Sequence, residues 1–269
     1  MRSPRSTTRS DLTGTSCDCI YLVTRPNLGR VGSHETVDWM VVRPPGAGPG
    51  AESLRERKKA LTRQRLTDTA TQMFLARGFD AVRVTEIAAA CDVSEKTVYN
   101  YFPTKESLVL DRWEATAKAL RASLADAGLH PVDAARGILA GELAALTSWL
   151  DGQDDTAAAI GSVRRFGELI AATPALRAHH NDTVNELVTI TSGLLASRAG
   201  LKADDPEPQI AATALMGLWA VHFTALRKYL DDARTPAAVY AAVTADVDAA
   251  AELIRAVLDR FALAPVRAG

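Results

Sequence analysis

The sequence predicts an all-α fold, with a small three-helix head followed by a larger helical body and about nine helices in all. Three observations support this fold class. Alanine is very frequent among the 269 residues, whereas β-branched and aromatic residues are sparse, and this composition favours helix over sheet. From Ser53 onward apolar residues recur at helical spacing, and no segment reads convincingly as a strand. Prolines and glycines separate these periodic segments, and both residues are common at the ends of helices.

The first 52 residues differ in composition from the rest of the chain. They begin with the Ser/Thr/Arg-rich stretch MRSPRSTTRSDLTGTS and end with the Pro/Gly-rich stretch RPPGAGPGAE. We therefore expect residues 1–52 to be a disordered extension and linker. Because Met40 lies just before the Pro/Gly-rich stretch, we also hypothesise that residues 1–39 are a mis-called extension. The intact mass of protein made from its own gene would test this.

Two helices are predicted at the start of the head. The first covers residues 53–77, and Gly78 follows it as a suitable C-terminal cap. Its apolar residues recur on one face at Leu66, Ala70, Met73 and Phe74. The second helix is short, covers residues 84–91, and is expected to bury Ile87 and Ala88.

A third short helix is predicted for residues 95–102. Ser94 is a favourable N-cap for it. Pro103 ends it, because proline disfavours helical geometry in the residue before it. Thr104 is then expected to cap a long fourth helix, residues 105–127.

Five further helices complete the predicted body, at residues 131–150, 154–172, 174–199, 206–231 and 236–262. Four of them begin near a proline, at Pro131, Pro174, Pro206 and Pro236. The most apolar stretch is residues 211–226, but its two threonines and His222 favour a buried helix over a membrane span.

The second and third predicted helices, joined by a tight turn, form a helix-turn-helix. The turn needs a residue that tolerates left-handed backbone, which Asp92 does, and the small Ala88 lets the helices cross closely. In such a unit the second helix lies in the DNA major groove and presents its N-terminal residues to base edges. The pattern therefore predicts a DNA-binding head.

Two tyrosines in the third helix support this prediction. Helical residues two apart project about 200° apart, so Tyr99 and Tyr101 cannot share one buried face. On a helix in the major groove, hydroxyls on opposite sides can each donate to phosphate, and Lys105 adds a cation nearby. Phe102 is the ring expected to be buried. The alternative is that both tyrosines pack against the first helix.

Charge is distributed unevenly along the chain. Residues 53–112 carry a net charge of +3 and residues 113–269 a net charge of −5. A basic start on an otherwise acidic protein favours binding of a polyanion at one end, although a solvated helix face would give the same pattern. The segment 43–59 is either an arm along the DNA minor groove or a plain linker.

The stretch TVYNYFPTKESL, preceded by GFDAVRVTEIAAACDVS, resembles the DNA-binding head of the TetR family of transcriptional regulators over about residues 58–112. The resemblance implies a homodimer with a head at residues 53–104, a ligand-binding and dimerisation body at residues 105–269, and usually repression. It places base contacts on Thr85, Glu95, Lys96 and Thr97, and phosphate contacts on Tyr99, Tyr101 and Lys105. Arg83 stands where the family commonly has a threonine that caps the second helix. The side-chain cap is therefore lost, but the arginine offers a cation that could bind phosphate.

The last two predicted helices, residues 206–231 and 236–262, are the expected homodimer interface. Small and apolar residues form a stripe on each, with Ile210, Ala214, Gly217, Leu218, Val221 and Ala225 on the first and Val239, Val243, Val247, Ala250, Ile254, Val257 and Phe261 on the second. Core packing within one subunit would give the same stripes. In a dimer, two recognition helices about 34–36 Å apart would read a near-palindrome.

For a small-molecule pocket the body offers aromatic and polar side chains, namely Trp149, Phe166, Trp219, His222 and Phe223. The alternative is that these rings are ordinary core residues. No catalytic residue, metal site or cofactor is expected. The adjacent His179 and His180 project about 100° apart, which makes a poor metal pair, and the three cysteines complete no zinc site.

Together these patterns predict a cytoplasmic, non-membrane transcriptional regulator. We expect a homodimeric repressor that binds a near-palindromic double-stranded DNA operator and is released by a small-molecule effector, through a tilt of the fourth helix. An enzyme is the first alternative, but no G-x-S-x-G, P-loop, dinucleotide or H-E-x-x-H motif is present. A helical interaction module without a ligand pocket is the second.

Overall fold

The computed structural model describes residues 54–110, 113–231 and 233–261. Within these residues the chain forms nine α-helices, two 3-10 turns and no strand, which confirms the all-α fold class. The predicted extension at residues 1–52, with Cys17 and Cys19, lies outside the described residues.

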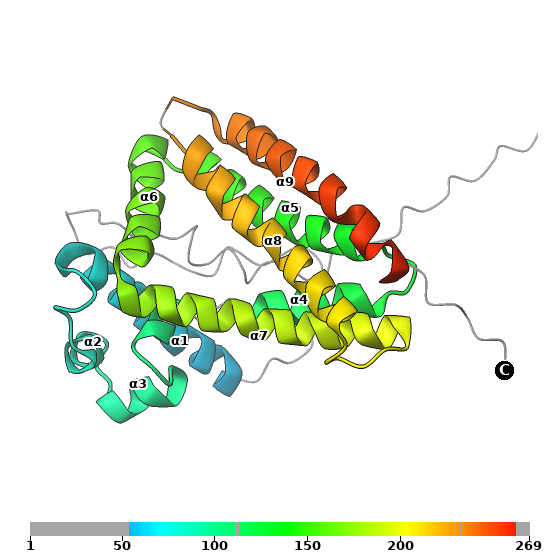
Figure 1. The fold of residues 1–269 in the computed structure, drawn as a ribbon. Coiled ribbons are helices and arrows are strands. Elements are labelled where there is room, and N and C mark those ends of the chain that lie inside the picture. The colour runs from blue at the N-terminus through cyan, green and yellow to red at the C-terminus, as the bar shows by residue number, and fades with distance from the viewer. Residues whose placement is uncertain (1–53, 111–112, 232, 262–269) are drawn as a thin grey trace, which may run out of the picture.

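The head consists of three helices and the body of six (Figure 1). The head holds α1 (Leu54–Arg77), α2 (Val84–Ala90) and α3 (Glu95–Tyr101), followed by the 3-10 turn η2 (Glu106–Leu108). The body holds α4 (Trp113–Ala125), α5 (Pro131–Asp151), α6 (Thr156–Ala172), α7 (Pro174–Ala199), α8 (Pro206–Tyr229) and α9 (Pro236–Leu258), with the 3-10 turn η3 (Asp259–Phe261) at its end. In Figure 1, α7 runs between the head and the crossing of α8 over α5, and α9 lies beside α8.

The head turns form as the sequence predicts. The Ser94 Oγ accepts the backbone N–H of Thr97 at 3.1 Å and so caps α3. Asp92, in the turn between α2 and α3, has φ of 53°, and among the described residues it is the sole non-glycine with positive φ. Gly78 follows α1 with φ of 84°, the conformation typical of a helix-terminating glycine.

The predicted fourth helix is wrong at its start, because α4 begins at Trp113 and not at Lys105. Thr104 and Ser107 instead hold a tight turn, in which the Thr104 Oγ1 accepts the Ser107 N–H at 3.1 Å and the Ser107 Oγ accepts the Thr104 N–H at 3.2 Å. Ser107, Leu108 and Val109 are all buried. Three consecutive buried residues do not fit a helix that buries only one face, and here the η2 turn carries them into the head.

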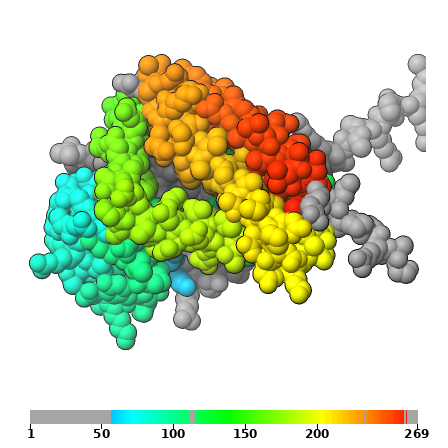
Figure 2. Space-filling model, viewed as in Figure 1, coloured from blue at the N-terminus to red at the C-terminus, as the bar shows by residue number. Residues whose placement is uncertain are grey.

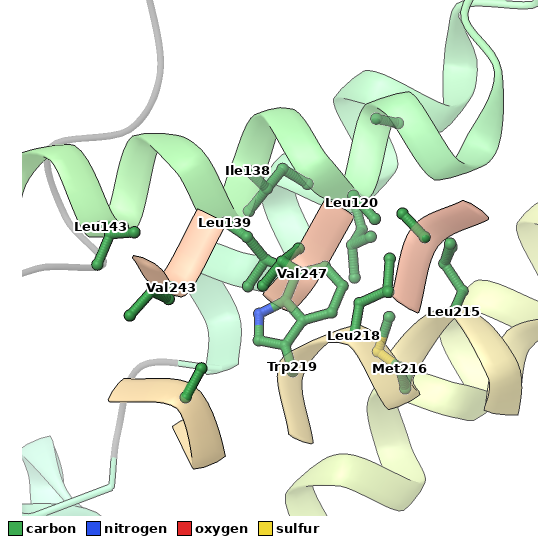
Figure 3. Close-up of a cluster of buried hydrophobic side chains, with 14 of the residues drawn as sticks. Leu120, Ile138, Leu139, Leu143, Leu215, Met216, Leu218, Trp219, Val243 and Val247 are labelled. Carbon is green, nitrogen blue, oxygen red and sulfur yellow. The ribbon is translucent and has the colours of Figure 1, made fainter. Parts of the chain in front are cut away.

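Two hydrophobic clusters build the core. The body cluster draws on helices α4 to α9, and Figure 3 shows part of it where α5, α8 and α9 meet around Trp219. The head cluster joins α1, α2, α3 and η2, but it also includes Phe166 of α6 and Leu176 of α7. Since α6 and α7 contribute to both clusters, they connect the head to the body by direct packing.

Nearly half of the residues in the two predicted dimer stripes are core within one subunit. Six of its residues are buried, Leu218, Ala225, Val239, Val243, Val247 and Phe261. The α9 stripe faces α5 and α8 of the same chain, which is the alternative that the sequence left open. Ile210 and Val257 remain exposed, at 63% and 47%.

Helix α8 is long and apolar enough to cross a membrane by length and composition. Half of its most apolar window is buried inside the protein, where α8 packs against α5, α7 and α9. This packing accounts for its composition, as the sequence predicts for a buried helix.

Candidate DNA-binding surface and body cavity

Helix α3 lies at the outer edge of the head and presents its N-terminal residues to solvent (Figure 1). Glu95 and Lys96 are exposed, and so is Thr85 at the start of α2. Thr97 is half-buried, and its Oγ1 lies 2.8 Å from the Ser94 Oγ, so its hydroxyl is already engaged in the cap. The predicted base-contacting side chains therefore gather on one outward surface, with Thr97 the least accessible of them.

The two tyrosines of α3 differ in exposure. Tyr99 is 45% exposed, whereas Tyr101 is half-buried and packs against the head cluster. Phe102 is fully buried, as expected. The opposite projections of the two tyrosines leave Tyr99 free at the surface and hold Tyr101 at the edge of the core.

Arg63 has a role that its place in the basic stretch of α1 does not reveal. Its Nη1 donates to the carbonyl oxygen of Tyr101 at 2.8 Å, and its guanidinium lies 4.5 Å above the Phe102 ring. Arg63 thus stabilises the C-terminal end of α3, where carbonyl groups lack helical partners. The neighbouring Arg57, Lys58, Lys59 and Arg65 are exposed.

Lys105 points into the head in this structure. Its Nζ donates to the carbonyl oxygen of Phe79 at 2.6 Å and lies 4.2 Å from the centre of the Phe79 ring. Burial lowers the pKa of the Lys105 ammonium, although nearby Asp80 opposes this. A phosphate contact by Lys105 would have to share the ammonium with the Phe79 carbonyl.

Glu86 supplies the cap that Arg83 cannot provide for α2. A guanidinium has no acceptor, but the Arg83 backbone N–H donates to the Glu86 Oε2 at 2.8 Å, and Arg77 donates to the Glu86 Oε1 at 2.9 Å. The hydrogen bond from the Arg83 backbone and the one from Arg77 lower the pKa of the Glu86 carboxyl. The exposed Arg83 side chain is left available at the head surface.

The five ring residues predicted for a ligand pocket do not form one site. Trp149, Trp219 and Phe223 pack in or against the body cluster, whereas Phe166 is part of the head cluster. Of the five, His222 alone lines the cavity described next. Its ring meets Phe223 edge to face, with 5.4 Å between the ring centres.

A cavity of about 190 Å³ lies between α5, α8 and α9. It is lined by Arg136, Gly137, Leu139, Ala140, Leu143, His222, Thr244, Val247 and Asp248. His222 is 4% exposed, and burial lowers the pKa of its imidazole to about 4. The Thr244 Oγ1 is buried without a hydrogen-bond partner, and so is the Trp219 Nε1 in the neighbouring core (Figure 3).

Ion pairs join α5 to α9 beside this cavity, and one of them pairs its lining residues Arg136 and Asp248. The Arg136 Nη2 lies 2.6 Å from the Asp248 Oδ1, and the Arg255 Nη2 lies 2.6 Å from the Asp133 Oδ1. The hydrogen bond from Arg255 lowers the pKa of the Asp133 carboxyl. These contacts fix α5 against α9 and compensate the charges beside the cavity. In the described part of the chain, no three His, Cys, Asp or Glu residues come together as a metal site would require.

Two family models match this chain. The model for bacterial regulatory proteins, tetR family, matches residues 66–111, and the model described as MftR C-terminal domain matches residues 156–259. The HTH-type transcriptional regulator TcmR of Streptomyces glaucescens is 31% identical over 160 residues, which cover 58% of this chain and 69% of TcmR. The chain belongs to the TetR family of transcriptional regulators.

The chain is also similar to two further regulators and to a solved structure. The MftR protein of Mycobacterium tuberculosis (strain ATCC 25618 / H37Rv), a transcriptional regulator assigned to mycofactocin biosynthesis, is 26% identical over 212 residues, covering 78% of this chain and 98% of MftR. The HTH-type transcriptional repressor DhaR of Mycobacterium sp. (strain GP1) is 33% identical over 95 residues, covering 34% of this chain and 46% of DhaR. Among solved structures, NalD of Pseudomonas aeruginosa covers 71% of this chain and 96% of its own, with 20% identity and a TM-score of 0.44.

In this TetR-family regulator the first family match contains all of the candidate DNA-contacting residues, whereas the second contains only part of the cavity. All eight predicted DNA-contacting residues fall within residues 66–111. The α8 and α9 walls of the cavity fall within residues 156–259, but its α5 wall, from Arg136 to Leu143, lies between the two matches. The α5 wall is therefore the part of the cavity that neither family model describes.

Proposed function

We propose that this TetR-family regulator is a homodimeric repressor that binds a near-palindromic operator and leaves it when a small molecule binds the body. The observation that supports DNA binding most directly is the exposed face of α3, where Glu95 and Lys96 project from a helix capped by Ser94. A short helix held in this way suits the major groove. The names of TcmR as a regulator and DhaR as a repressor support the repressor role.

The proposed DNA contacts divide into two kinds. Base edges are read by Thr85, Glu95, Lys96 and Thr97, and phosphates are bound by Arg83, Tyr99, Tyr101 and Lys105. Those of the proposed contact residues whose side chains are exposed could reach DNA without any rearrangement of the head. Thr97, Tyr101 and Lys105 are held by contacts within the head, so their share of the affinity should be smaller.

The proposed dimer interface is the outer face of α8 and α9. On this face Ile210, Leu253 and Val257 are exposed, with Leu253 at 82%. The exposed residues around them are mostly small, among them Gly217, Ala220, Ala241, Ala245, Ala249 and Ala256. Small residues let helices approach closely, as in a four-helix interface between two copies. Figure 2 shows α8 and α9 uncovered, on the side of the molecule away from the head.

The domain division that we propose is a head at residues 53–104 and a body at residues 105–269. A conformational change in the body can reach the head by two routes, through η2 and α4 or through the packing of Phe166 and Leu176 in the head cluster. We propose that effector binding shifts α4 and α6 together and so changes the spacing of the two α3 helices. By reciprocity, operator DNA weakens effector binding by the same factor.

The proposal also includes a cytoplasmic location and no enzymatic activity. The test is selection of bound sequences from a random DNA pool, followed by titration of the selected complex with cell extract. A near-palindromic sequence whose affinity falls steeply with salt is expected, and the extract should release it. A purified protein with no salt-sensitive affinity for any DNA would overturn the proposal.

A further inference from the structure

We propose that the cavity between α5, α8 and α9 binds a compact, uncharged molecule that has an apolar body and one hydroxyl or carbonyl group, which is held by His222 and Thr244. The inference rests on the proposed function, because it assigns a chemical class to the effector. The size of the cavity, one unpartnered polar atom and the compensation of the charges support it independently.

The volume of the cavity suits a ligand with a small apolar body. An engineered cavity of about 150 Å³ lined by apolar residues binds benzene. This cavity is slightly larger, at about 190 Å³, and Leu139, Leu143 and Val247 form its apolar walls. A single ring, or an aliphatic group of similar volume, with one short polar substituent fits these dimensions.

One buried polar atom at the cavity lacks a partner in the folded protein. The Thr244 Oγ1 is buried and unpartnered, although a helical threonine commonly donates to the carbonyl four residues before it. His222, which is 4% exposed, also lines the cavity and offers a second polar group. Buried polar groups are normally satisfied, so a ligand with one hydroxyl or carbonyl group would supply what the Thr244 hydroxyl lacks.

The charges around the cavity are compensated. Arg136 lines it, but its guanidinium is paired with Asp248 at 2.6 Å and Asp133 at 3.4 Å. Burial keeps the His222 imidazole neutral at pH 7, because it lowers the pKa to about 4. A charged ligand would lose its hydration without gaining an opposite charge, and this disfavours anions and cations alike.

Gly137 helps to make the space. It lies on the cavity wall within α5, and a Cβ built at this position would meet no atom within 4 Å. Gly137 is exposed, and its missing side chain leaves room on this side of the cavity. A larger side chain at residue 137 therefore provides a direct way to fill the cavity.

The test uses four compounds that share one ring: benzyl alcohol, toluene, benzoate and benzylamine. Binding is measured by thermal shift of the full-length protein and by tryptophan fluorescence, since Trp219 lies beside Leu139 and Val247 of the cavity wall (Figure 3). Benzyl alcohol should bind tightest. Toluene should bind roughly tenfold more weakly, because the polar groups then stay unpaired, and the two ions more weakly still.

Two substitutions locate the site. Thr244→Val should reduce the preference for benzyl alcohol over toluene, because it removes the hydroxyl while keeping the side-chain shape. Gly137→Leu should abolish binding of both. Gly193→Leu in α7 is the matched control, since a Cβ there also meets nothing within 4 Å but the residue is not part of the cavity wall.

Three results would overturn the inference: an ion binding as tightly as benzyl alcohol, neither neutral compound binding at its solubility limit, or unchanged binding in Gly137→Leu. DNA binding measured on the same samples separates the two proposals. Operator release by extract that persists in Gly137→Leu would refute this cavity as the effector site and leave the proposed function standing. Absence of DNA affinity would refute the proposed function, whereas the four compounds would still test the cavity.

Discussion

The Arg63 Nη1 of α1 donates a hydrogen bond to the carbonyl oxygen of Tyr101, the last residue of α3, at 2.8 Å. The same guanidinium stacks on Phe102 at 4.5 Å. One side chain therefore holds the end of the proposed recognition helix against the first helix of the head. Arg63 is a positioning residue, and its effect on DNA binding should differ from that of a phosphate contact.

Arg63→Ala should weaken operator binding about tenfold and lower the free energy of unfolding by about 2 kcal/mol, since a charged hydrogen bond and a stacking contact are lost. The slope of log affinity against log salt should stay unchanged. A residue that binds phosphate would reduce that slope by about 0.9 in each subunit, and such a reduction would contradict the positioning role. Arg65→Ala is the control, because the Arg65 side chain is exposed on the same helix.

Lys96 and Tyr99 should respond differently to substitution, because we assign them to different kinds of contact. Lys96→Ala should change the preferred operator sequence, with a loss of about 1–3 kcal/mol at a single base position of each half-site. Tyr99→Phe should weaken binding by about 1 kcal/mol on every sequence, because it removes one hydrogen bond to phosphate. Affinity measurements on a set of single-base operator variants distinguish the two. Equal losses on all sequences for both variants would refute the assignment, and Lys202→Ala, an exposed lysine in the body, should have no effect.

The turn before α3 contains stored strain, since Asp92 has φ of 53°. Asp92→Gly should raise the free energy of unfolding by about 0.5 kcal/mol, because glycine takes this conformation without a steric cost but loses more entropy on folding. Asp92→Ala should lower it by about 1 kcal/mol. Urea titration of both variants measures the changes, and a stabilised alanine variant would show that the turn is not strained.

The helix boundaries were largely predictable because their signals are local. Pro131, Pro174, Pro206 and Pro236 are the first residues of α5, α7, α8 and α9, where a missing N–H is tolerated. The Ser94 cap formed as expected, and so did the left-handed turn at Asp92. These features depend on a few neighbouring residues, so the sequence alone indicates them.

Features that depend on distant residues were not predictable in the same way. Arg63 resembles its basic neighbours in the sequence, and its partner lies 38 residues further on. The sequence places Phe166 with the aromatic residues of the body, but packing places it in the head cluster. The cavity combines Gly137 of α5 with Thr244 of α9, two residues without any local signal, and only the crossing of the helices brings them together.

Arg198 of α7 joins three separate parts of the body. Its guanidinium donates to the carbonyl oxygens of Leu124 at 3.0 Å, Leu129 at 2.8 Å and Phe261 at 2.9 Å, and so connects the end of α4, the loop before α5 and η3. Arg198→Ala should lower the free energy of unfolding by about 3 kcal/mol, because several part-buried carbonyl groups lose a charged donor. Urea unfolding measures this change, and the m-value is expected to stay the same. Arg177→Ala, an exposed arginine on the same helix, should change it by less than about 0.5 kcal/mol, and similar losses in both variants would refute this role.

His222 should make the stability of the protein depend on pH. Burial lowers the pKa of its imidazole from 6.5 to about 4, so below pH 6.5 the unfolded chain takes up a proton that the folded protein does not. The stability is therefore complete above pH 6.5 and falls by about 1.4 kcal/mol per pH unit as the pH drops towards 4. Between about pH 7 and pH 5 the loss should be about 2 kcal/mol.

His222→Gln removes this titrating group and should flatten the pH dependence, even if the variant is less stable at every pH. The contribution of His180, whose pKa burial also lowers, remains in both proteins and cancels in the comparison. Chemical unfolding of both proteins at several pH values measures the two slopes. Equal slopes would show that His222 takes up a proton in the folded protein as readily as in the unfolded chain, and its assignment as a neutral, buried group of the cavity wall would then be wrong.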